Sequence, residues 1–184
     1  MINKKLIRVL YQICADKNDV YDFTLADYLN TEYTVNADYE IPYLAGYSKD
    51  GKTIYIDKRL PRWISNHLDE KETYPDLPHL PQILKDLITA YINGLVRHER
   101  SEKYFEDYKK YKYPYAHELA TAEERKLVTS YGIDWDTYQN YMLKMVKKFK
   151  TFSGPLPPDI DTKPEKDTHD YYRYHKIKRL EGKE

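Results

Sequence analysis

The fold and the chemistry of this chain both depend on one stretch, Leu-Val-Arg-His-Glu-Arg-Ser-Glu at residues 95–102. Apolar residues lead into it at spacings of four, three and four: Leu84, Ile88, Tyr91 and Leu95. This spacing is typical of one face of an amphipathic helix that packs on a core. The same face continues through His98 and Glu102. The pattern therefore predicts that both side chains point inward, one helical turn apart, with Glu99 beside them.

A second interpretation of the same segment is a solvated helix end. Most residues from Arg97 to Lys110 are polar or charged, and Glu99/Lys103 and Glu106/Lys110 have the i, i+4 spacing of surface ion pairs. Short motifs occur often by chance in such runs. The two interpretations differ in one observable, the burial of His98 and Glu102.

The composition favours one soluble domain. The chain has 184 residues, enough for a single core, and its 30 basic and 30 acidic residues cancel. We expect a domain over residues 1–152, with its core at about 40–150, and an extended or disordered tail over 153–184. The single cysteine, Cys14, excludes a disulfide framework, and no stretch is long and apolar enough for a membrane span. A cytoplasmic protein with no membrane association is the expectation.

The predicted fold class is α+β. Two β-prone runs at 41–47 and 52–57 flank the turn Asp50-Gly51, which predicts an antiparallel hairpin. Pro42 favours an edge position for the first strand. Helices are expected from about Pro81 to Lys110, from Pro114 to a stop at Gly132, and after the N-cap Asp134. The small sheet would pack against this mainly helical part.

A metal site needs further ligands, and the following helix offers them. His117 and Glu124 share one face of that helix, and a short turn makes the two helices antiparallel neighbours. His98, Glu102 and His117 are therefore the candidate ligands, and Glu124 and Asp57 are additional candidates. Two imidazoles and a carboxylate suit Zn²⁺, and they suit Fe²⁺ or Mn²⁺ as well.

With these residues the chain resembles the zincin-like metallopeptidases. Their core has a strand followed by a helix with the motif His-Glu-x-x-His, which residues 53–57 and His98-Glu99-Arg100-Ser101-Glu102 match in part. Glu102 stands where that motif has its second histidine. The resemblance implies His98 as a metal ligand, Glu99 as the general base that activates a metal-bound water, and Glu102 as a carboxylate ligand. The run over about 40–150 also looks like small uncharacterised phage and prophage proteins, which would place the chain in the host cytoplasm.

Three functions follow from these patterns. The first is a metal-dependent, peptidase-like hydrolase acting on a peptide or protein. The second is a non-catalytic phage-type interaction or inhibitor protein, in which the polar cluster is structural. The third and weakest is nucleic-acid binding through the tyrosine-rich basic tail after Thr168, which the neutral composition disfavours.

Overall fold

The computed structural model describes residues 23–41, 43–61, 64, 80–149 and 154–163. The chain forms two compact units, Met1–Thr31 and Glu32–Glu184. The first unit contains helix α2, Leu25–Leu29, which begins with a capping box between Thr24 and Asp27. Of the expected domain and tail, residues 1–22, 42, 62–63, 65–79, 150–153 and 164–184 lie outside the described residues. All further elements that the structure describes belong to the second unit.

The predicted hairpin is confirmed. Strand β2, Ala45–Tyr47, pairs antiparallel with β3, Thr53–Ile56. Gly51 adopts a φ of +69° in the turn between them, a conformation that favours glycine. Ser48 supports the same turn, because its Oγ donates to Asp50 and accepts from the backbone N–H of Thr53.

A third strand makes the sheet mixed. Strand β1, Thr34–Asn36, pairs parallel with β3, so the strand order is β1-β3-β2. The local pattern did not indicate β1, because three residues are too few for an alternation to be recognised. Strand β2 lies at the edge of this order, as Pro42 suggested. The outcome is a small mixed sheet in an α+β fold.

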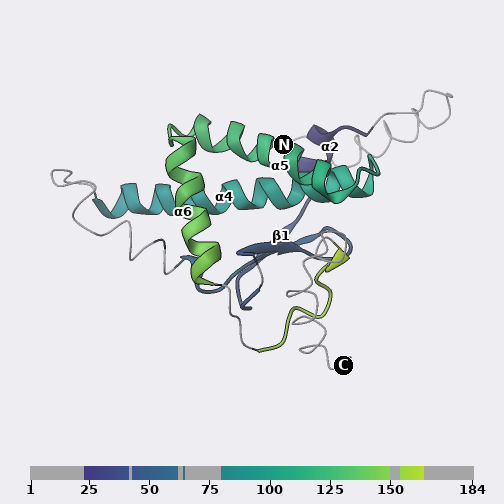
Figure 1. The fold of residues 1–184 in the computed structure, drawn as a ribbon, viewed down its shortest axis with the longest axis horizontal. Coiled ribbons are helices and arrows are strands. Elements are labelled where there is room, and N and C mark those ends of the chain that lie inside the picture. The colour runs from purple at the N-terminus through teal and green to yellow at the C-terminus, as the bar shows by residue number, and fades with distance from the viewer. Residues whose placement is uncertain (1–22, 42, 62–63, 65–79, 150–153, 164–184) are drawn as a thin grey trace, which may run out of the picture. The chain divides into compact units, whose positions relative to one another are not determined.

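Three helices make up most of the remaining described residues. Helix α4 spans Leu80–Asp107, α5 spans Tyr113–Ser130 and α6 spans Trp135–Lys148. Helix α4 packs against α5 and against strands β2 and β3, and Figure 1 shows it between α5 and the sheet. Both predicted helix boundaries after α4 are confirmed, because Gly132 has a φ of +78° after α5 and Asp134 caps α6 by accepting from Thr137 N.

Part of the predicted tail lies against the sheet. In the segment 154–163, Ile160 forms an isolated antiparallel bridge with Ser48, and Asp161 N donates to the carbonyl of Tyr47. Lys103 of α4 is buried and binds Asp161 with an Nζ to Oδ2 distance of 2.7 Å. This strap, residues 154–163, thereby fixes Asp161 at the end of β2. No helix within the described ranges has the length and apolar character needed to cross a bilayer.

Candidate metal centre

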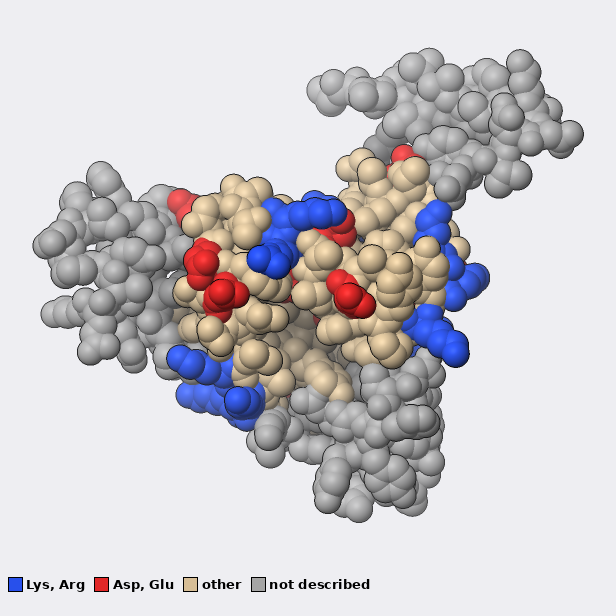
Figure 2. Space-filling model, turned by 45° about the horizontal axis from the view of Figure 1, so that its top comes forward, with Lys and Arg blue, Asp and Glu red and all other residues tan. Residues whose placement is uncertain are grey.

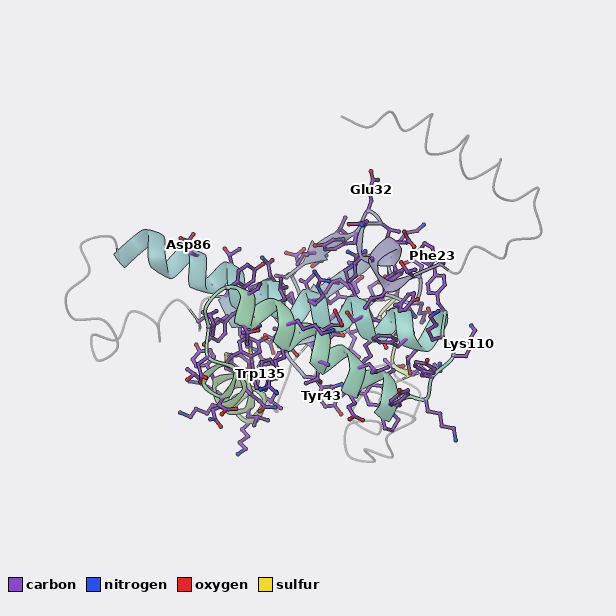
Figure 3. The ribbon with its side chains drawn as sticks, turned by 90° about the horizontal axis from the view of Figure 1, so that it is seen from above. Phe23, Glu32, Tyr43, Asp86, Lys110 and Trp135 are labelled. Atoms are coloured by element: carbon purple, nitrogen blue, oxygen red, sulfur yellow. The ribbon has the colours of Figure 1, made fainter. Side chains whose placement is uncertain are left out.

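A cavity of about 290 Å³ opens between four elements of the second unit. It is lined by residues of β2 and the chain before it, of α4, of α5 and of α6, and by Asp161 of the strap. Tyr43 and Trp135, both labelled in Figure 3, belong to this lining. Glu99, His98, Glu102, His117 and Glu124 also line the cavity, so five of the six candidate residues from the sequence meet there.

The solvated-helix interpretation is wrong for this part of α4. His98 is 8% exposed and Glu102 is 4% exposed, and Lys103 and Glu106 are buried as well. The apolar face of α4 continues inward past Leu95, as the spacing predicted. Burial of these groups requires partners, because a charge removed from water without one is strongly destabilising.

The three candidate ligands converge on one point. His117 Nδ1 lies 2.8 Å from Glu102 Oε2 and 3.0 Å from His98 Nε2, and His98 Nε2 lies 3.4 Å from the same Glu102 oxygen. Three tetrahedral ligands at about 2.1 Å from a shared zinc ion would be about 3.4 Å apart. The three observed separations, 2.8, 3.0 and 3.4 Å, are therefore at most about 0.6 Å shorter than this arrangement requires. His98, Glu102 and His117 together form a group that could hold a metal ion.

Glu124 fixes the orientation of His98. Its Oε2 lies 2.9 Å from His98 Nδ1, and since an ionised carboxylate only accepts, the imidazole donates from Nδ1. Nε2 is then the nitrogen that faces Glu102 and His117, and it can present a lone pair there once a metal ion replaces its proton. The other Glu124 oxygen accepts from the Tyr138 hydroxyl of α6 at 2.5 Å. Carboxylate partners of this kind are the usual support of histidines that bind metals.

Tyr47 of β2 supports Glu102 in a similar way. Its hydroxyl lies 3.2 Å from Glu102 Oε1 and 3.1 Å from Glu106 Oε2. Burial raises the pKa of the Tyr47 phenol, and the nearby charge of Glu102 raises it further, so the hydroxyl stays protonated and can donate. Because the Tyr47 hydroxyl binds Oε1 of Glu102, the other carboxylate oxygen, Oε2, remains directed at the two histidines.

The carboxylates next to His98 favour a positive charge at this point of the site. Burial alone would lower the pKa of His98, but hydrogen bonds to Glu102 and Glu124 raise that pKa well above 6.5. Burial acts to raise the pKa of Glu102, but hydrogen bonds from His117 and His98 hold it at about 2. Glu102 is thus stabilised in its charged form next to His98. A divalent cation at the same point would take over this role from the imidazole proton.

Gly94 lets Tyr138 reach the site. A Cβ at this position would lie 2.6 Å from the Tyr138 hydroxyl oxygen and 2.9 Å from a methyl group of Val128. Side chains of α6 and α5 therefore make the close approach that requires a glycine at this position. Gly94 stands one helical turn before His98, so the space it leaves admits the hydroxyl that binds Glu124.

The backbone before β2 is strained where it borders the cavity. Tyr43 and Leu44 have φ values of +67° and +86°, which residues with a Cβ adopt rarely. The Leu44 carbonyl accepts from Asp57 N at 2.8 Å, and this bond helps to hold the segment. Strained residues of this kind cluster at binding and catalytic sites.

Asp57 lies outside this group. Its carboxylate accepts from Ile41 N and Arg59 N and binds the Arg59 guanidinium, and it is not among the residues that line the cavity. Two residues that sequence reasoning did not assign to the site, Tyr47 and Tyr138, hold its carboxylates. Tyr138 lies in an apolar stripe of α6, and such a stripe by itself indicates only core packing. The available signal was Gly94, because a small residue one turn before His98 admits a large side chain from another element.

Only the geometry of its residues supports this site. Comparisons of the chain with models of protein families, with curated proteins and with solved structures found no match.

Proposed function

We propose that this protein is a metal-dependent hydrolase whose ion is held by His98, Glu102 and His117. The observation that carries the proposal is the convergence of these three donor atoms within 3.4 Å at the wall of a cavity. Each of the two buried ligands has a supporting hydrogen bond from a different element, Tyr47 for Glu102 and Glu124 for His98. Such support is expected of ligands that must present a fixed lone pair.

The donor set indicates which ions fit. Two imidazoles and one carboxylate are the ligands of catalytic zinc sites that keep a position open, and the same set binds Fe²⁺ and Mn²⁺. Zn²⁺ is the ion we propose first. His117 is 48% exposed while Glu102 is almost fully buried, so solvent and substrate reach the group from the side of α5. When bound, the ion would polarise a carbonyl and acidify water.

Glu99 is the proposed general base. It lines the same cavity as the three ligands and is neighbour to His98 on α4. In hydrolysis of an amide, water adds its oxygen to the carbonyl carbon and the C–N bond breaks. Glu99 would accept a proton from the attacking water and return it to the leaving nitrogen, so that no other reactant is needed. A peptide or protein is the proposed substrate, and a cytoplasmic location is part of this proposal.

The first test is metal content. Protein purified without a metal-affinity tag would be assayed by mass spectrometry as wild type, His98→Ala and His117→Ala, before and after incubation with zinc. Near-stoichiometric metal in the wild type and its loss in both variants is the expected result. Glu118→Ala is the matched control, because Glu118 is an exposed neighbour of His117 on α5 and does not line the cavity. A folded wild type without metal after zinc incubation would overturn the proposal.

A second candidate function is favoured by one surface feature. The turn between α4 and α5 and the start of α5 expose Tyr108, Tyr111 and Tyr115, with Lys110 and Lys112 among them. Exposed tyrosines are common at sites of protein interaction. The face drawn in Figure 2 carries small separate groups of basic and acidic side chains rather than one large field. A non-catalytic interaction protein would retain its partner when the metal ligands are replaced and would lose it when these tyrosines become serines.

A further inference from the structure

The cavity beside the candidate metal ligands has an apolar wall. Helix α6 contributes Trp135, Met142, Leu143 and Val146 to the lining, and Leu44 and Leu95 add to it from the segment before β2 and from α4. Trp135 and Met142 are also part of the main hydrophobic core, so this wall is rigidly supported. An apolar group of a ligand would therefore find a preformed surface within the same cavity that holds His98 and His117.

The charges around the cavity select against anions. Among the described residues that line it, Glu99, Glu102, Glu124 and Asp161 are acidic and none is lysine or arginine. The nearby Lys103 is already bound to Asp161 and Asp107. Sites that bind phosphate groups usually supply arginine or lysine side chains to them. The acidic side chains whose charge the metal ion does not neutralise would repel a phosphate ester or a nucleic acid.

The size of the cavity limits what enters it. At about 290 Å³ it lies at the lower end of the range for small-molecule pockets. It can take one residue-sized group and the bond beside it. An extended ligand would have to continue outside, past the half-exposed Leu143 at the rim.

We propose that the site takes uncharged acyl substrates, amides or esters, whose aliphatic or aromatic side chain lies against the α6 wall next to the carbonyl group. This inference rests on the proposed function and specifies its substrate class. Burial of one such side chain is worth about 10- to 100-fold in affinity. The acidic lining adds discrimination against substrates with a negative charge at the same position.

Hydroxamates test the inference, because they bind zinc sites without being turned over. The zinc-loaded full chain would be titrated with three hydroxamates that carry a methyl, a benzyl or a carboxymethyl group, with dissociation constants from calorimetry. We expect the benzyl compound to bind about 10- to 100-fold more tightly than the methyl compound, and the carboxymethyl compound to bind most weakly. Equal affinities, or tightest binding of the carboxymethyl compound, would overturn the inference.

A variant at the rim ties the preference to α6. Leu143→Asp places a charge on the apolar wall, and since Leu143 is 50% exposed, the substitution is compatible with folding. The ratio of benzyl to methyl affinity should fall about tenfold or more. Val35→Asp is the matched control, because Val35 is 49% exposed on β1 and does not line the cavity, and its ratio should equal that of the wild type. An unchanged ratio in Leu143→Asp would also overturn the inference.

The experiment separates this inference from the function on which it rests. If the protein binds zinc and all three hydroxamates with similar affinity, the substrate class is wrong and the metal site stands. If the protein binds neither zinc nor any hydroxamate, the proposed function fails, and the substrate class fails with it.

Discussion

Two buried carboxylate groups in this domain show opposite kinds of bonding. Asp57 is fully buried, and its two oxygens are occupied by backbone N–H groups and by the guanidinium of Arg59, two residues away. Glu102 is also buried, but one of its oxygens lies 2.8 and 3.4 Å from two imidazole nitrogens at the wall of a cavity. The first carboxylate is saturated by groups whose charge is fixed. The second is bound to groups that can exchange a proton for a metal ion, and this difference separates a structural acid from a candidate ligand.

The largest expected effect on stability comes from removing the structural carboxylate, Asp57. Asp57→Ala removes the acceptor of the backbone N–H groups of Ile41 and Arg59 and the nearer of the two acidic partners of the Arg59 guanidinium, which keeps Glu40 at 3.6 Å. Each N–H left without an acceptor costs about 1–3 kcal/mol, so we expect the free energy of unfolding to fall by about 3–5 kcal/mol. Urea denaturation would measure it, with Asp38→Ala as an exposed control that should change stability by less than about 0.5 kcal/mol. A loss below about 1 kcal/mol would show that Asp57 is not the structural group described here.

Metal removal should have the next largest effect on stability. We expect this effect only when the ligands of the candidate site are intact. At a free zinc concentration about 100 times the dissociation constant, binding adds about 2.7 kcal/mol to stability. For a domain of this size that raises the melting temperature by about 5–10 °C. Thermal unfolding with zinc and then with excess EDTA would measure the difference. The same treatment of His98→Ala should give no shift, and a full shift in that variant would place the ion elsewhere.

A smaller effect is expected where Tyr138 and Glu124 support His98. Tyr138→Phe removes the hydroxyl that binds Glu124 Oε1, while the ring stays packed against Tyr91 and Trp135. Loss of a group that orients a ligand typically reduces metal affinity about 10- to 100-fold. Competition with a chromogenic zinc chelator would give the affinity, and the visible bands of the Co²⁺ form would report the ligand geometry. Tyr141→Phe, on the same helix but outside the cavity lining, should leave both unchanged.

The smallest effect is expected at Gly94. Gly94→Ala gains about 1 kcal/mol of helix propensity, but its Cβ would collide with the Tyr138 hydroxyl at 2.6 Å and with Val128. Overpacking of this kind costs about 1–3 kcal/mol, so we expect a net loss of stability of about 0–2 kcal/mol together with weaker zinc binding. Combination with Tyr138→Phe removes the closest contact. The two changes should therefore couple in a double-mutant cycle, and strict additivity would contradict the contact.

The sequence by itself determined the parts of the protein that depend on local spacing. The face of α4 that carries His98 and Glu102 inward follows from the 3.6-residue period, the β2–β3 hairpin follows from Asp50-Gly51, and the start of α6 follows from its cap at Asp134. His117 and Glu124 were found because a short turn makes consecutive helices neighbours. These features need only residues close together in the chain.

Only the tertiary structure decided which groups complete the site. Tyr47 reaches Glu102 across 55 positions of the chain, and Tyr138 reaches Glu124 across 14. Asp57 was a plausible ligand by its position after a strand, yet its oxygens are taken by Arg59 and by the backbone. Hydrogen bonds between different elements depend on how those elements pack, and a local period carries no information about that. The role of each buried carboxylate was therefore fixed by its neighbours in space.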